Sequence, residues 1–301
     1  MTIALQNVEI GYLKGKERTV VLSNINNILN AGELTCLLGA NGVGKSTLLR
    51  TLAGFQPKLK GKIDINQQDI NSYSHKALAK VISIVLTKRP QVYNMTSFEL
   101  VATGRTPYTD FWGKLTPQDE TFINQAFEEV GIRHLKKRYI NTLSDGERQK
   151  VMIAKALVQD TPIILLDEPT AFLDYPSKVE IMQLLVELAH TKDKTILLST
   201  HDMELAFQVA DNIWLFDKEK QLITGTPEDL AINHHFASFF DHTGICFDST
   251  KGLFIVEHPK YWKVHLSSIS PYAEMVRRAL ARNNIQTTEQ EIDGMPKILL
   301  N

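Results

Sequence analysis

The sequence predicts an α/β fold in which a phosphate-binding loop joins a buried strand to a helix. Residues 39–46 have the spacing Gly-x4-Gly-Lys-Ser, with the apolar run Leu34–Leu38 before them and the helical segment Thr47–Leu52 after them. Two further apolar runs, Ile163–Leu166 and Thr195–Ser199, are separated by a segment of helical character. This alternation is typical of parallel strands joined by crossover helices.

The N-terminal residues and two later segments predict antiparallel strands around this core. Residues 1–30 contain two stretches in which apolar and polar residues alternate, joined by polar turns. Gly61–Asn66 is typical of another short strand, and Trp214–Phe216 with Gln221–Gly225 is typical of a late hairpin. We therefore expect a mixed sheet core with an antiparallel β subdomain. The alternating apolar positions are Ile3, Leu5, Val8, Val20, Val21, Ile25 and Ile28.

Residues 76–160 change character and predict a helical subdomain. Thr96–Glu99 and Ser144–Glu147 both fit the capping-box pattern of a helix start. From about residue 240 the pattern changes again, so we expect a main domain at 1–239 and a small α+β accessory domain at 240–301. The expected elements of the latter are strands at Ile245–Phe247, Leu253–Val256, Trp262–Leu266 and Lys297–Leu300, and a helix at Pro271–Asn283 capped by Ser270.

The composition is that of an ordinary globular protein. The 301 residues are 43% apolar and 22% charged, and the net charge of −1 gives no basis for non-specific binding to nucleic acid or an anionic bilayer. Cys36 and Cys246 lie far apart in sequence, so we expect a reducing compartment and no disulfide. No signal-peptide pattern and no apolar stretch of about 20 residues is present. We expect a soluble, cytoplasmic protein in which any membrane role must come through a partner.

The loop at residues 39–47 has the composition of a nucleotide phosphate site. Its glycines allow a tight turn that points backbone N–H groups at an anion, and the next helix adds its positive N-terminal end. Lys45 supplies a charge for the outer phosphates and Ser46 a hydroxyl ligand for Mg²⁺. A chance glycine-rich turn is disfavoured because the flanking strand and helix are both present. The chain is therefore expected to bind a nucleoside triphosphate.

Two acids and a histidine follow the later apolar runs. Asp167 and Glu168 end the first run, at the sheet edge where α/β folds bind ligands. We expect Asp167 to hold Mg²⁺ and Glu168 to polarise an attacking water. His201 follows the second run and can hydrogen-bond a γ-phosphate or that water. Taken alone, the acids can simply end a strand and the histidine can be incidental; their pairing with the phosphate loop favours a hydrolytic site.

Leu143–Gln149 begins a helix and has two interpretations. The first is a well-capped amphipathic helix. The second is a further phosphate clamp made of Ser144, Gly146 and the helix N-terminus. The residues alone leave both open.

In their combination and order, these motifs resemble the ATP-binding subunits of ABC transporters over about residues 1–235. The resemblance implies the P-loop NTPase cassette fold and an ATPase. It also implies a head-to-tail homodimer with two ATP molecules at the interface, each held by one subunit's phosphate loop and the other's signature helix. The residues it implies are Gly39, Asn41, Gly42, Gly44, Lys45, Ser46 and Thr47 in the Walker A loop, Tyr12 stacking on adenine, Ser46 and Asp167 on Mg²⁺, Glu168 and His201 in hydrolysis, Ser144, Gly146 and Glu147 in the signature motif acting in trans, and Asp174 in the D-loop.

Two positions depart from the family pattern. Asp145 replaces a glycine of the usual Leu-Ser-Gly-Gly signature, which several importer subfamilies tolerate. Thr87 stands where the family's Q-loop glutamine contacts Mg²⁺ or water and transmits nucleotide status to the membrane subunits. We expect Thr87 to act there through a water. The alternatives are that Gln91 takes the glutamine's place or that this step is weakened.

The segment after Thr87 resembles importer subunits for iron–siderophore, haem or cobalamin, through Gly104–Tyr108 and Phe111–Gly113. The resemblance implies permease subunits as partners, a solute-binding protein acting indirectly, no nucleic acid, and a peripheral position on the inner face of the membrane. About half of the large apolar side chains here are expected in the core, and the rest in a groove for a short coupling helix of the permease. They are Tyr93, Met95, Phe98, Tyr108, Phe111 and Trp112.

Two other functions stay open from the sequence. One is a soluble ABC ATPase acting on ribosomes, DNA or iron–sulfur assembly, which the single phosphate loop and the lack of sustained heptads disfavour. The other is a non-enzymatic, nucleotide-gated regulatory module, which ATPase activity lost in Glu168→Gln would exclude. The histidines of the C-terminal appendage match no common metal-ligand spacing. We expect the appendage to bury surface against its own cassette or against its twin.

Overall fold

The computed structural model describes residues 2–15, 17–87, 94–110, 112–217, 219–236, 244–248, 253–268, 272–290 and 294–300. The chain forms two compact units, Met1–Leu230 and Ala231–Asn301, and each is treated by itself. The expected domain boundary at 239/240 lies outside the described residues and stays a prediction. Among the helices of the described ranges, none is both long enough and apolar enough to cross a membrane.

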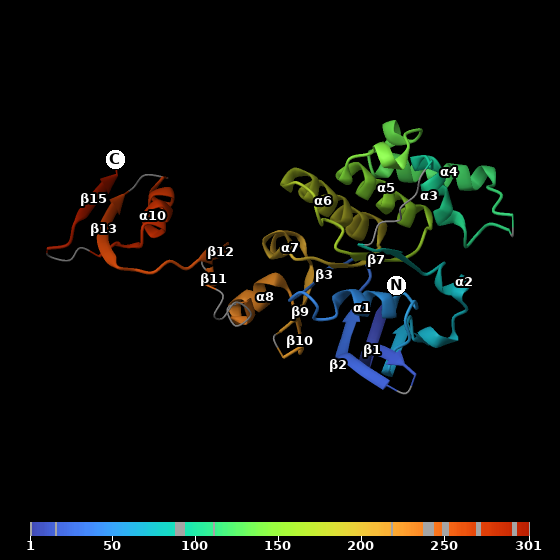
Figure 1. Cartoon of the computed structure of the whole chain (residues 1–301), viewed down its shortest axis with the longest axis horizontal. Coiled ribbons are helices and arrows are strands. Elements are labelled where there is room, and N and C mark those ends of the chain that lie inside the picture. Colours follow the sequence, from blue (N-terminus) through green and yellow to red (C-terminus); the bar gives the residue numbers. More distant parts are fainter. Residues whose placement is uncertain are drawn as a thin grey trace. The chain divides into compact units, whose positions relative to one another are not determined.

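A six-stranded sheet forms the centre of the first unit (Figure 1). Its order is β10-β9-β3-β8-β7-β6, and every neighbouring pair is parallel except β10 with β9. All residues of β7 and β8 are buried, as expected of apolar runs in a sheet covered on both faces. The predicted parallel core and late hairpin are confirmed. The strands are β3 Leu34–Gly39, β6 Ile82–Val85, β7 Ile163–Asp167, β8 Thr195–Ser199, β9 Asn212–Phe216 and β10 Leu222–Gly225.

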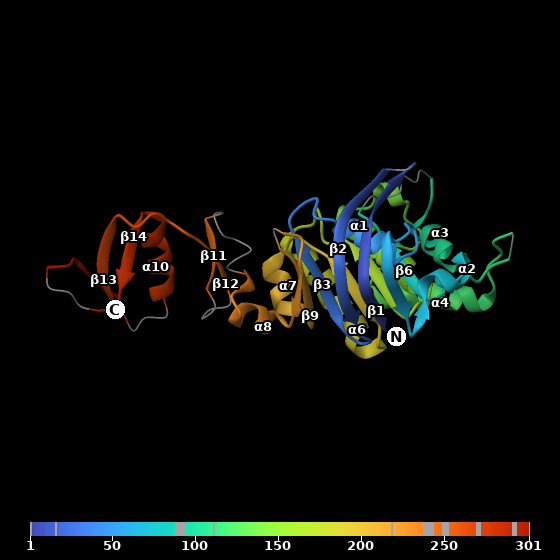
Figure 2. The same cartoon turned by 90° about the horizontal axis from the view of Figure 1, so that it is seen from below.

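A four-stranded antiparallel sheet, in the order β2-β1-β4-β5, shares its core with the central sheet. Helix α1, Lys45–Leu52, packs between them, since its buried leucines contact the same cluster as residues of both sheets. Figure 2 shows β1 and β2 of this sheet side by side. The strands are β1 Ile3–Lys14, β2 Glu17–Leu29, β4 Lys60–Ile65 and β5 Gln68–Asp69.

The side chains of β2 do not all face the way the alternation suggested. Ile25 is buried, but Val20 and Ile28 are 45% and 55% exposed, and Leu22 and Leu29 occupy the core instead. The register between β1 and β2 shifts along the pair, and each shift changes which residues face inward. A strict period of two therefore assigns the wrong face to part of this strand.

Three helices form the helical subdomain, on the other side of the central sheet from the antiparallel sheet (Figure 1). Each begins with a capping box, at Thr96–Glu99, Thr116–Asp119 and Ser144–Glu147, so the two predicted boxes are confirmed. The expected helical range 76–160 also contains β6, which pairs with β7 at the edge of the central sheet. The helices of this unit after α1 are α2 His75–Leu78, α3 Ser97–Ala102, α4 Pro117–Glu129, α5 Asp145–Val158, α6 Tyr175–Lys192 and α7 Met203–Val209, with 3₁₀ turns η1 Ile70–Ser72, η2 Thr103–Arg105, η3 Arg133–Leu135 and η4 Ile140–Thr142.

The second unit contains a two-stranded antiparallel sheet and a three-stranded parallel sheet, β14-β13-β15. The rings of Phe236, Phe247 and Phe254 pack together, with centroids 4.9–5.9 Å apart. Strand β14 was missed, and the helix begins at Ala273; the expected cap Ser270 lies outside the described residues. The elements are β11 Ile245–Asp248, β12 Leu253–Val256, β13 Trp262–Ser268, α10 Ala273–Arg282, β14 Ile285–Thr288 and β15 Lys297–Leu300, and α8 Pro227–Ile232 precedes them.

Candidate active site

The phosphate loop leaves β3 at Gly39 and enters α1 at Lys45. Gly39 and Gly44 have φ angles of 150° and 124°, a region that L side chains rarely adopt. A Cβ at position 44 would lie 2.6 Å from Val21 Cγ1, and one at position 39 would lie 3.2 Å from Phe216 Cβ. Both positions therefore need glycine for their backbone conformation, and position 44 needs it for space as well. The spacing of the motif therefore has a physical cause in this fold.

Lys45 is buried, with 6% of its surface exposed. Its Nζ donates hydrogen bonds to the carbonyl oxygens of Gly39 at 2.7 Å and of Ala40 at 3.2 Å. Burial lowers the pKa of Lys45, and the charges of Glu168 and Asp167 oppose part of that shift. The loop thus holds a cation at the place where the phosphates of a nucleotide are expected.

Asp167 is the centre of a hydroxyl network at the end of β7. Its Oδ1 accepts hydrogen bonds from Ser46 Oγ at 2.8 Å and from Ser199 Oγ at 2.9 Å, and its backbone carbonyl accepts one from Thr87 Oγ1 at 2.9 Å. Asp167 as a whole residue is 2% exposed. Ser46 and Asp167 therefore present a hydroxyl and a carboxylate oxygen in contact, which are the hard oxygen donors that suit Mg²⁺. This donor set fits the predicted metal.

Glu168 directly follows the strand and has a left-handed backbone, with φ at 50°. Its N–H donates to the carbonyl oxygen of Ser199 at 3.1 Å and to the Ser199 hydroxyl at 3.0 Å, which fix this uncommon conformation. The Glu168 carboxylate contacts Nε2 of His201. The structure thus brings together the two residues that the sequence suggested for hydrolysis.

A cavity of about 240 Å³ lies over the phosphate loop. Tyr12 reaches it from β1: its hydroxyl and the Thr47 hydroxyl are 3.0 Å apart, and 49% of Tyr12 is exposed. The predicted loop residues other than Gly39, the aromatic residue and the two predicted catalytic residues thus line one cavity. The lining residues are Tyr12, Val21, Asn41, Gly42, Gly44, Lys45, Ser46, Thr47, Glu168 and His201.

The signature residues do not line this cavity. Ser144 caps α5, where its hydroxyl accepts from the Glu147 N–H at 3.2 Å and its own N–H donates to the Glu147 carboxylate at 2.8 Å. That backbone hydrogen bond is the main cause of the lowered pKa of Glu147. Asp174 caps α6 by accepting from the Ser177 N–H at 3.2 Å, and hydrogen bonds from the Ser177 hydroxyl and N–H lower the Asp174 pKa. A Cβ at Gly146 would lie 3.3 Å from Ser177 Oγ, so the signature and D-loop segments are neighbours in the chain's fold.

Sequence reasoning missed the role of Ser199. It lies opposite Asp167 in the parallel register of β7 and β8, and it bridges the Asp167 carboxylate and the Glu168 N–H. The available signal was a serine ending an apolar run next to the run that carries the acids. Thr87 was predicted to act through a water; in the structure its hydroxyl donates to the Asp167 carbonyl oxygen. Gln91, the alternative, lies outside the described residues.

About half of the apolar side chains after Thr87 were expected in the core, but none of the four that the structure describes is fully buried. Met95 and Phe98 are partly buried, Tyr108 is 37% exposed and Trp112 is 86% exposed. Tyr93 and Phe111 lie outside the described residues.

Comparison with known proteins identifies the family. Residues 22–171 match the family described as ABC transporter. The chain is 39% identical over 249 residues to an uncharacterized ABC transporter ATP-binding protein of Methanocaldococcus jannaschii, covering 83% of this chain and 84% of that one. It is 38% identical over 214 residues to the petrobactin import ATP-binding protein FpuD of Bacillus anthracis, covering 71% and 78%. It is 32% identical over 228 residues to the ferric enterobactin transport ATP-binding protein FepC of Escherichia coli, covering 74% and 84%.

Solved structures agree with this assignment. An inward-facing putative metal-chelate type ABC transporter matches with a TM-score of 0.69 and 27% identity, over 79% of this chain and 88% of that one. A dimeric bacterial ABC transporter cassette matches with a TM-score of 0.65 and 27% identity, over 75% and 98%. The predicted cassette fold is confirmed. This chain belongs to the ATP-binding proteins of ABC transporters and is an ATPase of that family.

Proposed function

We propose that this chain is the ATP-hydrolysing subunit of an importer for iron–siderophore complexes, bound to permease subunits at the inner face of the membrane. The observation that carries the proposal is the cavity where Lys45, Glu168 and His201 meet the phosphate loop. The substrate class is supported by the names of its relatives, which include import proteins for petrobactin, achromobactin and ferric enterobactin.

Nucleotide binding uses the groups around the loop. The exposed ring of Tyr12 stacks on adenine, and the N–H groups of the loop with Lys45 hold the phosphates. Ser46 and Asp167 hold Mg²⁺, which when bound neutralises charge on the outer phosphates. The Lys45 ammonium exchanges its bonds to the loop carbonyls for bonds to phosphate oxygens.

Hydrolysis uses Glu168 and His201. Glu168 orients a water for attack on the γ-phosphate and accepts its proton, as a general base. His201 contacts the Glu168 carboxylate and fixes the direction of that carboxylate. The His201 side chain is 44% exposed, so it can also reach the γ-phosphate. The Ser199 hydroxyl bonds the Asp167 carboxylate and the Glu168 N–H, so it fixes the backbone that carries Glu168 before substrate arrives.

A second copy of the chain completes each site in a head-to-tail dimer. Ser144, Gly146 and the start of α5 contact the γ-phosphate held by the other subunit, with Glu147 fixing Ser144 and Asp174 adjoining the interface. This assignment is supported by the position of the signature residues outside the cavity of their own chain. Thr87 links the end of β7 to the segment that follows β6, which is the route toward the permease.

The proposal is tested with the purified chain and its co-expressed membrane partner. Glu168→Gln is expected to lower ATP hydrolysis by about 10²–10⁴-fold while ATP still binds, because only the base is removed. Glu187→Gln is the control, since Glu187 is an exposed acid on α6. An affinity-tagged chain is expected to retain a multi-helix membrane protein, and iron–siderophore uptake is expected to stop in the Glu168→Gln strain. Full activity of Glu168→Gln would overturn the catalytic assignment, and unchanged uptake would overturn the transport assignment.

A further inference from the structure

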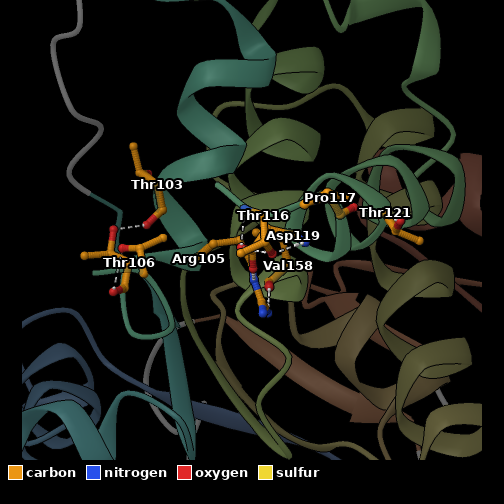
Figure 3. Close-up of polar contacts among 9 residues, drawn as sticks. Thr103, Arg105, Thr106, Thr116, Pro117, Asp119, Thr121 and Val158 are labelled. Carbon is orange, nitrogen blue, oxygen red and sulfur yellow. Dashed lines mark hydrogen bonds and ion pairs between the residues drawn. The ribbon is translucent and has the colours of Figure 1, made fainter. Parts of the chain in front are cut away.

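Arg105 is a buried cation in the helical subdomain, in the Gly-Arg-Thr-Pro-Tyr motif that the nucleotide chemistry does not use. Only 5% of its surface is exposed. Its Nε donates to Asp119 Oδ1 at 2.7 Å, and its Nη1 donates to the carbonyl oxygen of Val158 at 2.9 Å (Figure 3). The rings of Tyr108 and Phe122 lie 4.0 and 4.5 Å from the guanidinium carbon. One side chain thus joins η2, α4 and the last residue of α5.

Gly104 allows this contact. A Cβ at position 104 would lie 2.4 Å from the carbonyl oxygen of Lys155 and 2.5 Å from Val158 Cγ1. The backbone of η2 therefore lies directly against the last turn of α5, and no larger residue fits. Gly104 lets the two backbones approach, and Arg105 adds hydrogen bonds and an ion pair. Both residues contact the C-terminal end of α5 or its neighbours.

Asp119 is held in place by Thr116 independently of Arg105. Its Oδ2 accepts from the Thr116 N–H at 2.9 Å and from the Thr116 hydroxyl at 2.6 Å, as the capping box of α4 (Figure 3). The Thr116 hydroxyl is the main cause of the lowered pKa of Asp119, and Arg105 adds to it. The carboxylate therefore stays ionised and offers its other oxygen to Arg105 in a set direction.

We propose that Arg105 is a positioning residue that aims the signature helix. Helix α5 is anchored by Arg105 at Val158 and presents Ser144 and Gly146 at its other end. Its 14 residues make a rod of about 21 Å, so a pivot of about 5° at the anchored end moves the far end by about 2 Å. A displacement of that size is enough to misalign a phosphate contact. The inference rests on the proposed dimer, in which that end meets the partner's ATP.

The test uses full-length chains in a Glu168→Gln background, so that bound ATP is not consumed. Arg105→Met removes the hydrogen bonds to Asp119 and Val158. Arg105→Lys keeps a cation for Asp119 but lacks the planar guanidinium that bonds Asp119 and Val158 at once. Arg133→Met is the control, because Arg133 makes an exposed pair with Glu128 in the same subdomain. Three quantities are measured: ATP binding by the monomer, ATP-driven dimerisation by sedimentation, and backbone hydrogen exchange without nucleotide.

Both Arg105 variants are expected to bind ATP within about twofold of the parent but to need about tenfold more protein to dimerise. Hydrogen exchange is expected to rise along α5 as far as its first turn, while Arg133→Met matches the parent. Unchanged dimerisation by Arg105→Lys together with exchange confined to residues 103–108 would show that Arg105 only stabilises its surroundings and would overturn the proposal. If the parent itself fails to dimerise with ATP, the proposed dimer is wrong and the inference that rests on it is overturned as well. If the parent dimerises and both Arg105 variants match it, the inference alone is overturned.

Discussion

Replacing Thr87 with valine tests how the end of β7 is held. The two side chains have almost the same shape, so the substitution removes only the hydrogen bond from the Thr87 hydroxyl to the Asp167 carbonyl, 2.9 Å long and partly buried. Such a bond contributes about 1 kcal/mol, and its loss leaves a carbonyl oxygen without that donor. For a unit of 230 residues, this corresponds to a fall in Tm of about 2–4 °C.

The same free energy sets the expected change in activity. If the whole of it acts on the position of Asp167, a loss of about 1 kcal/mol corresponds to about fivefold in kcat. Phosphate release is measured across a Mg²⁺ titration, with Thr87→Ser expected to retain activity because it keeps the hydroxyl. Thr191→Val is the control, since Thr191 makes the same kind of bond on the exposed surface of α6. Thr87→Val with unchanged kcat, Mg²⁺ dependence and transport would refute the reasoning.

Three further predictions concern the loop and the thiols. Gly44→Ala is expected to weaken ATP binding by about tenfold or more, because its Cβ would lie 2.6 Å from Val21 Cγ1 at a φ of 124°; a fluorescent ATP analogue measures this, and unaltered affinity would contradict it. Burial lowers the pKa of Lys45, so this ammonium loses its proton at lower pH than an ordinary lysine, and ATP affinity is expected to fall as pH rises through that pKa. Lys45→Met is expected to lack this pH dependence in calorimetry. A thiol reagent is expected to modify Cys246 in the native protein and Cys36 only after unfolding, because Cys36 is fully buried; early labelling of Cys36, detected by peptide mass, would contradict it.

The local features of the site could be predicted because their chemistry lies in short stretches. The phosphate loop needs glycine at 39 and 44 for reasons of backbone angle, and Ser144 with Glu147 specifies a helix start within four residues. The capping box at Thr116 has the same hydrogen bonds but was missed, because aspartate stands at its fourth position in place of glutamate. Strand β14 was missed because its sequence Ile-Gln-Thr-Thr carries one apolar residue.

The contacts that join distant segments could not be predicted in this way. Ser199 acts on Asp167 because the register of β7 and β8 places them opposite each other, and 32 residues separate them in the chain. Arg105 meets a carbonyl oxygen 53 residues away. No local pattern records such pairings, because they depend on strand register and on how the helices pack.

The long-range anchors formed by Thr87 and Arg105 are both hydrogen bonds from a side chain to a backbone carbonyl oxygen. Thr87 and Arg105 both lie on the stretch of chain between β6 and α4, Thr87 before α3 and Arg105 after it. Thr87 holds the carbonyl oxygen of Asp167, on the side that serves the ATP of its own subunit, whereas Arg105 holds the carbonyl oxygen of Val158, on the helix proposed to serve the partner's ATP. Each anchor uses a backbone carbonyl, so it fixes the path of an element and leaves the catalytic side chains free for the nucleotide. A force applied to this stretch would therefore reach both halves of the composite site through hydrogen bonds that the nucleotide itself does not make.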